Sequence, residues 1–226
     1  MYLNCKTFFS LRYGTISTDE LVTYACQYGI TSLALTNINI TSDTWNFVKA
    51  CRENGIKPIM GLECRNGHTF KYILLARNME GWFHINRFLS EHLHKKRDYP
   101  DRAPFLPGTF AIYAWGTVPL AALESHELTG IRPREINKLF RVDTQRYKDK
   151  LVILQPLTFQ SDEHYQLHRV LRAIDQNILI SQLSADTTAQ PDEHLISPAD
   201  LFDRFEQYPH IISNTLQIME IGRAHV

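Results

Sequence analysis

The chain has 226 residues, of which 44% are hydrophobic and 21% charged, so it can bury a full core and has the composition of an ordinary globular protein. Lys+Arg and Asp+Glu both number 24, which gives no sign of a basic surface for nucleic acid or membranes. No apolar run approaches the roughly 18–20 residues that span a bilayer. The cysteines, Cys5, Cys26, Cys51 and Cys64, show no Cys-x-x-Cys spacing, so we expect free thiols in a cytoplasmic protein.

The first half of the chain alternates short apolar runs with amphipathic stretches. Residues 2–14 are typical of a strand and its following loop, and Ser17 with Glu20 three residues later has the form of a capping box that begins a helix. Residues 32–36 suit a strand buried on both faces. Two more strands are expected at 56–64 and 70–76. Two more helices are expected, one after a cap at residues 41–43 and one from Met79 to about His94. Their predicted inner residues are Trp45, Val48 and Cys51, then Trp82, Ile85, Phe88 and Leu89.

The second half begins with a proline-rich surface connection at residues 95–108. Strands are expected at 109–113 and 151–154, and helices are expected to begin at Pro133, after Ser161 and after Ser197. The predicted inner residues are Ile136, Leu139 and Phe140, then Leu167, Val170, Leu171 and Ile174, then Leu201, Phe202 and Phe205. Strands that alternate with helices predict an α/β fold with a mainly parallel sheet, and periodicity alone leaves a barrel and an open sheet both possible.

The last six residues, 221–226, break the pattern of the helix before them and have the sequence that read-through into a common sequencing adapter would encode. We therefore expect a non-native tail there and a natural chain that continues differently after Glu220.

Six stretches of the chain match the ordered motifs of one known family. Residues 2–14 resemble Leu-His-x-His-Ser-x-Tyr-Ser-x-x-x-Gly, residues 33–39 resemble Ala-Leu-Thr-Asp-His-Gly, and residues 74–82 resemble Leu-Leu-Ala-x-Asn-x-x-Gly-Tyr. The most specific match is Gly55-Ile-Lys-Pro-Ile-Met-Gly-Leu-Glu63 to Gly-Ile-Lys-Pro-Ile-x-Gly-x-Glu, and residues 168–174 and 209–215 resemble the closing segment. Over residues 1–220 the chain resembles the polymerase-and-histidinol-phosphatase (PHP) domain that opens the alpha subunit of bacterial DNA polymerase III.

This resemblance implies a distorted (β/α)7 barrel of the PHP type, whose strand ends hold up to three metal ions on histidine and acidic ligands. The sequence departs from that pattern, because only Glu63 keeps a ligand type. The family's other ligand positions fall on Asn4, Lys6, Asn37, Ile38, Lys71, Pro156 and Thr158. One carboxylate cannot hold a metal cluster, and a lysine would repel cations, so we expect a degenerate metal site without bound cofactor. Lys6 or Lys71 could instead form a salt bridge with Glu63.

Several sharper hypotheses have a structural alternative that we favour. His164 and His168 are spaced i, i+4, as zinc ligands can be, but no third ligand lies near in sequence, so ordinary surface or capping histidines are expected. Ser10 with Thr7 has no nucleophile elbow and is expected to stabilise a turn. Trp45 and Trp82 are expected in the core rather than stacked on bases, and Trp115 is left open.

The resemblance implies the N-terminal domain of a replicative DNA-directed DNA polymerase. The parent protein would extend primed DNA with Mg²⁺ held in domains that this chain lacks, and the domain itself would be catalytically inactive and structural. Expected partners are the rest of the polymerase chain, a proofreading subunit and other replisome subunits, and DNA through the missing domains, with no membrane. The alternatives are a metal-dependent phosphoesterase or 3'-5' exonuclease that uses His164 and His168, and a free-standing degenerate PHP interaction module.

Overall fold

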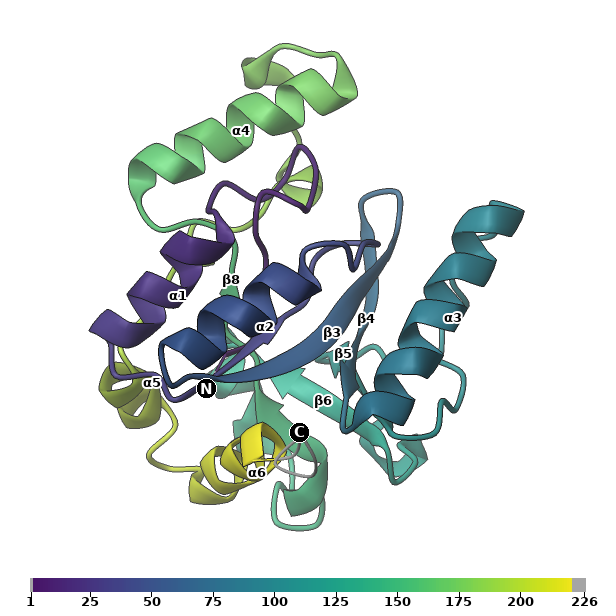
Figure 1. The fold of residues 1–226 in the computed structure, drawn as a ribbon. Helices are drawn as coiled ribbons and strands as arrows, with labels where there is room; N and C mark the ends of the chain where they lie inside the picture. The colour runs from purple at the N-terminus through teal and green to yellow at the C-terminus, as the bar shows by residue number, and fades with distance from the viewer. Residues whose placement is uncertain (1, 221–226) are drawn as a thin grey trace.

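The computed structural model describes residues 2–220. One curled sheet of eight strands forms its centre, in the order β7-β6-β5-β4-β3-β2-β1-β8 (Figure 1). The strands are β1 Tyr2–Cys5, β2 Ser32–Leu35, β3 Lys57–Asn66, β4 Thr69–Ala76, β5 Thr109–Ala114, β6 Glu127–Ile131, β7 Leu151–Ile153 and β8 Pro156–Leu157.

The sheet is joined into a ring by the chain itself. β7 pairs with β6 at one end of the strand order, and β8 pairs with β1 at the other end. Only Leu154 and Gln155 separate β7 from β8, so the two are halves of one bent segment. Counted this way the ring has seven strands, which confirms the expected distorted α/β barrel.

Most pairings in the sheet are parallel, as predicted, but β4 runs antiparallel to both β3 and β5. β3 and β4 form a hairpin through Gly67, which has a φ of +57°. A positive φ suits glycine because it has no Cβ.

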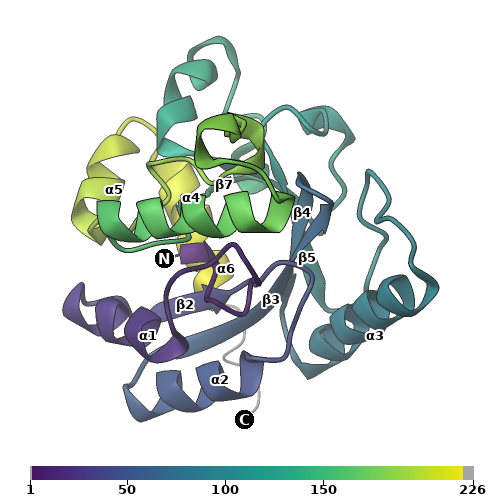
Figure 2. The same ribbon diagram turned by 90° about the horizontal axis from the view of Figure 1, so that it is seen from above.

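In the described part of the chain, six α-helices surround the sheet. They are α1 Thr18–Gln27, α2 Thr44–Glu53, α3 Met79–Lys95, α4 Asp162–Gln176, α5 Pro198–Arg204 and α6 Pro209–Glu220. The expected capping box of α1 is present, since Ser17 and Glu20 bond each other's backbone N–H groups. Seen from above, α4 crosses the loop that follows β1, whereas α3 stands apart beside β4 and β5 (Figure 2). The segment Pro133–Arg141 is helical as predicted, but as a 3-10 helix.

Apolar clusters fill the space between the helices and the sheet. α1 and α2 pack Leu21 and Phe47 against β1 and β2, and α3 packs Ile85 and Leu89 against β4 and β5. The side chains of Leu3, Ala34, Ile73 and Val152 meet in a further cluster contributed by strands around the ring.

Several predicted inner residues point outward. Trp45 is 76% exposed and Phe47 occupies the inner face of α2 instead. On α4, the buried side chains are His168, Arg172 and Ala173. The predicted core residues that are exposed are Phe140, Leu167, Val170 and Ile174. Periodicity finds an amphipathic stripe, but it does not show which face the rest of the fold covers.

The segment between α3 and β5 contains no helix or strand, in agreement with the expected connection at 95–108. It is nevertheless anchored, because Asn66 exchanges two hydrogen bonds with the backbone of Tyr99, whose side chain is buried. The predicted tail at 221–226 lies outside the described residues. Within the described part, no helix is long and apolar enough to cross a bilayer.

Candidate functional site

A buried ionic cluster lies at the carboxyl ends of β1, β2 and β8, beside the middle of β3. At its centre Glu63 is fully buried and Lys6 is 1% exposed. The Lys6 Nζ lies 3.0 Å from Glu63 Oε2 and donates to Asn4 Oδ1 at 2.6 Å, while Asn4 Nδ2 donates to the same Glu63 oxygen at 2.8 Å. The predicted salt bridge to Glu63 is therefore made by Lys6.

The other carboxylate oxygen of Glu63 accepts from the guanidinium of Arg65. That guanidinium also donates to the Tyr13 hydroxyl at 3.2 Å and lies over the Tyr13 ring, 4.4 Å from its centroid. Arg65 and Glu63 share one face of β3 because they are two residues apart in a strand. Both oxygens of Glu63 thus contact side chains that carry a positive charge.

A second buried carboxylate, Glu193, completes the cluster from the loop before α5. It accepts from Thr158 Oγ1 at 2.7 Å and pairs with Arg132 at 3.1 Å. Burial acts to raise the pKa of Glu193, but the charges of Lys6 and Arg132 and the hydrogen bond from Thr158 outweigh it and lower the pKa to about 2. Glu193 is therefore ionised at neutral pH.

The same balance holds for Glu63. Burial acts to raise its pKa, but the charges of Arg65 and Lys6 and the hydrogen bonds from Lys6 and Asn4 hold the pKa below its ordinary value. Two buried carboxylates are thus compensated by Lys6, Arg65 and Arg132. Such pairing is what makes a buried charge tolerable in a protein interior.

Asn37 and Ile38, at the end of β2, hold the loop that follows β1. Asn37 Oδ1 accepts from the backbone N–H of Thr7 and from Ser10 Oγ, both at 2.8 Å. The Ile38 backbone N–H donates to the same Ser10 hydroxyl at 3.0 Å. Ser10 and Thr7 therefore stabilise a turn, as the sequence indicated.

Of the other predicted ligand positions, Pro156 and Thr158 belong to the ionic cluster and Lys71 does not. Pro156 pairs with Asn4 through the strand register, and Thr158 bonds Glu193, so both belong to the cluster. Lys71 does not belong to it, because its Nζ lies 2.7 Å from Asp101 Oδ1 in the connection before β5. The alternative pairing of Lys71 with Glu63 is therefore wrong. The strand register is consistent with this, because Cys64 pairs with Tyr72 and Arg65 with Phe70, so Lys71 falls at an irregularity of the β3–β4 pairing and has no partner residue in β3.

Of the two histidines of the zinc hypothesis, His168 lies in the interior of the domain. His168 is fully buried, with its Nδ1 2.7 Å from the carbonyl oxygen of Tyr13 and its Nε2 accepting from the Ala189 N–H at 2.8 Å. The carbonyl requires a proton on Nδ1, so the ring is the neutral Nδ1–H tautomer with both nitrogens engaged. Burial lowers the pKa of His168 to about 4, against the hydrogen bond to Tyr13 and the charge of Glu193. His168 is thus a buried bridge and not the surface histidine that we expected.

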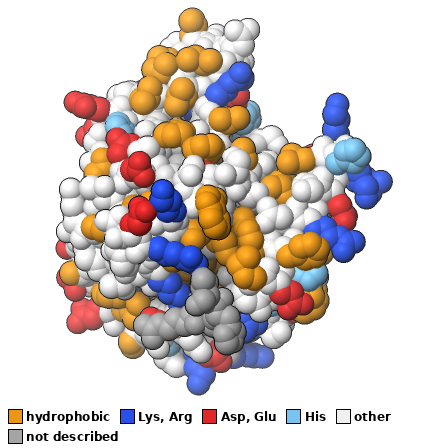
Figure 3. All heavy atoms as spheres, in the orientation of Figure 1, with side chains coloured by type: hydrophobic (Ala, Val, Ile, Leu, Met, Phe, Trp, Pro, Cys, Tyr) orange, Lys and Arg blue, Asp and Glu red, His pale blue; other side chains and the backbone are white. Residues whose placement is uncertain are grey.

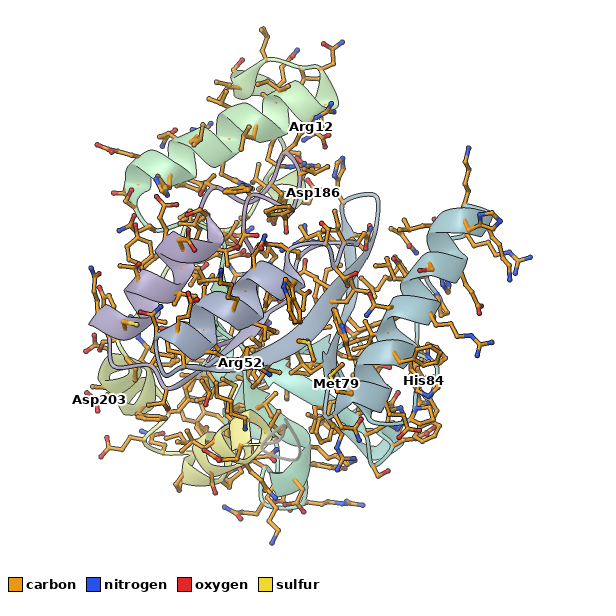
Figure 4. The ribbon with its side chains drawn as sticks, in the orientation of Figure 1. Arg12, Arg52, Met79, His84, Asp186 and Asp203 are labelled. Carbon is orange, nitrogen blue, oxygen red and sulfur yellow. The ribbon has the colours of Figure 1, made fainter. Side chains whose placement is uncertain are left out.

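Sequence reasoning missed four members of the cluster: Arg65, Glu193, Arg132 and Tyr13. A signal existed for Arg65, whose spacing of two from Glu63 on a strand places it on the same face. None existed for Glu193 or Arg132, which reach the cluster from distant loops. A cleft of about 310 Å³ opens above the cluster and is lined by Tyr13, Ile38, Arg65, His68 and Arg172 among others. In Figure 4, Arg12 lies beside α4 at this end of the molecule.

Among residues 2–220, no three His, Cys, Asp or Glu side chains gather in a group that could hold a metal ion. A curled α/β sheet with its polar cluster at the carboxyl ends of the strands defines the barrel-like class of α/β proteins, which place their sites there.

A sequence model of the PHP domain matches residues 3–224. The chain therefore belongs to the PHP domain family. It is 24% identical to an error-prone DNA polymerase of Symbiobacterium thermophilum over 97% of this chain and 25% of that protein. It is 21% identical to a DNA polymerase III subunit alpha of Neisseria meningitidis over 99% of this chain and 23% of that protein. A solved amidohydrolase from Chromobacterium violaceum aligns with 90% of this chain and 96% of its own, at 11% identity and a TM-score of 0.34.

The chain thus spans about a quarter of the length of the curated polymerase relatives that it matches. Another of these, the DNA polymerase III subunit alpha of Aquifex aeolicus, is 24% identical over 97% of this chain.

Proposed function

We propose that this chain is the N-terminal PHP domain of a replicative DNA-directed DNA polymerase alpha subunit, and that the domain has a structural rather than a hydrolytic role. The observation that carries the first part is the match of nearly the whole chain to one quarter of several polymerase chains. The polymerase chemistry and its Mg²⁺ belong to the missing domains, which would also contact DNA. A proofreading subunit and other replisome subunits are further proposed partners.

The ionic cluster supports the second part. The metal ions that the family implies need several anionic or imidazole ligands, whereas the residues at these positions are two asparagines, two lysines, an isoleucine, a proline and a threonine. The Lys6 ammonium lies between Asn4 and Glu63, and a cation brought beside it would be repelled. The donor set therefore does not fit a metal cluster, and we assign Lys6 the role of a fixed cation that neutralises Glu63.

The polymerase assignment is tested by sequencing the gene past the codon for Glu220. We expect a reading frame that continues for hundreds of residues into a polymerase with paired catalytic aspartates. A stop codon near residue 226 would instead make this a free-standing PHP protein and overturn the assignment.

The structural role is tested separately by metal analysis of the purified chain together with phosphatase and 3'-5' exonuclease assays in added Zn²⁺ or Mn²⁺. We expect substoichiometric metal and no activity that depends on it. Near-stoichiometric metal, with hydrolysis that Glu63→Gln abolishes, would contradict the proposal.

A further inference from the structure

A groove of about 500 Å³ lies between α2 and α3; it shares no lining residue with the ionic cluster and is unused by the proposed function. We call it the α2–α3 groove. Its floor consists of Pro58 and Met60 of β3 and the end of β4, and its walls include Trp45 of α2 and Trp82 of α3. Figure 3 shows apolar side chains gathered between these helices, with basic side chains next to them.

The groove exposes large apolar side chains that a lone globular domain would normally bury. Trp45 is 76% exposed and Met79 is 61% exposed, although both belong to well-formed helices. Tryptophan and methionine are enriched where proteins bind partners, and exposed apolar patches that polar residues surround are typical of such sites. Trp45 is exposed even though two other apolar residues, Val48 and Met60, line the same groove.

The charged side chains that line the groove are all basic. Its lining residues, all in the described part of the chain, include Arg52, Lys57 and Arg77 but no aspartate or glutamate. The whole chain has equal numbers of acidic and basic residues, so this is a local excess. Arg77 lies over the Phe110 ring, 4.9 Å from its centroid, and Lys57 donates to the carbonyl of Met219 at 2.7 Å. Within residues 2–220, neither Arg52 nor Arg77 forms an ion pair with an acidic side chain.

We infer that the α2–α3 groove binds a peptide segment of a partner protein that carries a large apolar anchor residue flanked by aspartates or glutamates. The apolar anchor matches the space between Trp45, Met60 and Trp82, and the acidic flanks match Arg52 and Arg77. In Figure 4, Arg52 lies at the end of α2 and Met79 at the start of α3, so the two mark opposite sides of the groove. A single-stranded nucleic acid fits less well, because the surface is mainly apolar and basic side chains do not track along it.

The test uses fluorescein-labelled peptides of about 12 residues in which Leu, Phe or Trp alternates with Asp and Glu, and charge-reversed copies with Lys in place of every acid. Binding to the 226-residue chain is measured by fluorescence anisotropy at low and high salt. We expect saturable binding of at least one acidic peptide, weakened by salt, and no binding of its charge-reversed copy.

Two groove variants and two matched controls locate the site. We expect Trp45→Ala and Arg52→Glu each to weaken binding by about tenfold or more. Lys49→Glu, on the same helix, and Phe140→Ala, at another exposed aromatic residue, should leave it unchanged. Circular dichroism of each variant is the check that the fold is retained.

Four outcomes would overturn the inference. In the first, no acidic peptide binds at millimolar concentration, and in the second, the charge-reversed copy binds equally well. In the third, Trp45→Ala leaves peptide binding intact. In the fourth, the chain self-associates in sedimentation and Trp45→Ala abolishes this self-association. Displacement of the peptide by oligothymidylate at equal concentration would favour nucleic acid and would also count against it. All of these results are independent of the polymerase assignment, which the gene sequence tests.

Discussion

Lys6 and Glu63 show how a buried carboxylate is kept ionised at the strand ends. Each is almost completely inaccessible to solvent, and their closest N and O atoms are 3.0 Å apart. An isolated buried carboxylate would become protonated or destabilise the fold, whereas a carboxylate between Lys6, Asn4 and Arg65 stays ionised. The positive charges that compensate Glu63 are therefore supplied by side chains of this chain.

Glu63→Ala should therefore lower the free energy of unfolding by about 3–5 kcal/mol, because it leaves Lys6 and Arg65 buried without their anion. Urea titration at pH 7 measures the loss. Glu53→Ala is the control, since Glu53 and Lys49 form an exposed pair with 4.0 Å between their charged atoms and should contribute little. An unchanged melting temperature in Glu63→Ala would mean that the cluster does not stabilise the fold.

His168 should make stability depend on pH in a defined window. Its pKa is lowered to about 4 in the folded chain, against about 6.5 when unfolded, so between these values the unfolded chain binds more protons. The free energy of unfolding should rise from pH 4 to pH 6.5, by up to about 3 kcal/mol, and be greatest above that range. The stabilisation is lost as the pH falls and the imidazole must be charged.

His168→Gln is the matched variant, because its amide can donate to the Tyr13 carbonyl and accept from the Ala189 N–H. Urea titrations at pH 5 and pH 7 should differ much less in this variant than in the wild type. Burial also lowers the pKa of His210, which accounts for a remaining slope. Equal pH dependence in both proteins would show that His168 is not the responsible group.

At the scale of elements, the sequence predicted most helices and strands because capping residues and long apolar runs are local signals. The Ser17 capping box and the strand that ends near Glu63 are examples. It missed β6 and β8, because β6 contains a glutamate and a glycine and β8 has only two residues. It also misplaced the exposed face of α4, since burial of Arg172 and His168 depends on distant partners such as Thr187 and Tyr13.

The candidate site was predictable only in part, because some of its residues meet through contacts between distant parts of the chain. Positions that follow strand ends in sequence, such as Lys6 and Asn37, were expected and do come together. Glu193 has no pattern around it that indicates a buried ion, and its role follows from where the loop before α5 returns to the sheet. Contacts between residues far apart in the chain are set by the complete fold rather than by local sequence.

α6 is an element whose side chains complete the edge of the sheet at β7. Thr215 Oγ1 accepts from the Ile153 N–H at 2.8 Å, and Asn214 Nδ2 donates to the Leu151 carbonyl at 2.8 Å. These bonds satisfy backbone groups that a strand edge would otherwise leave unpaired.

Thr215→Val keeps the shape of the side chain but removes the acceptor, so the buried Ile153 N–H loses its partner. We expect a loss of about 1–3 kcal/mol in the free energy of unfolding, measured by urea titration. Ser213→Ala, on the exposed side of the same helix, is the control and should have little effect. A loss of the same size in both variants would point to helix propensity instead of the bond to β7.

At the scale of the whole molecule, the strands of the ring contribute side chains to the four largest apolar clusters. The bent segment through Leu154 and Gln155 joins β7 to β8. It therefore connects the side of the sheet next to α5 and α6 with the side that contains β1. Strands β3 and β4 contribute residues both to the cluster under α3 and to the cluster shared around the ring. Separation of the β3–β4 pair from either cluster would therefore expose apolar surface that both clusters share.

We accordingly expect the 226-residue chain to unfold in urea as one cooperative unit. Trp45, Trp82 and Trp115 lie on α2, on α3 and after β5, so tryptophan fluorescence reports on different sectors, while far-UV circular dichroism reports on all of the helices. The two signals should give coincident transitions with a single midpoint, because partial unfolding would break the ring. Separate midpoints, with fluorescence changing before circular dichroism, would show that the α2 and α3 side opens independently. That result would mean that joining the sheet edges through Leu154 and Gln155 does not couple the two halves of the domain.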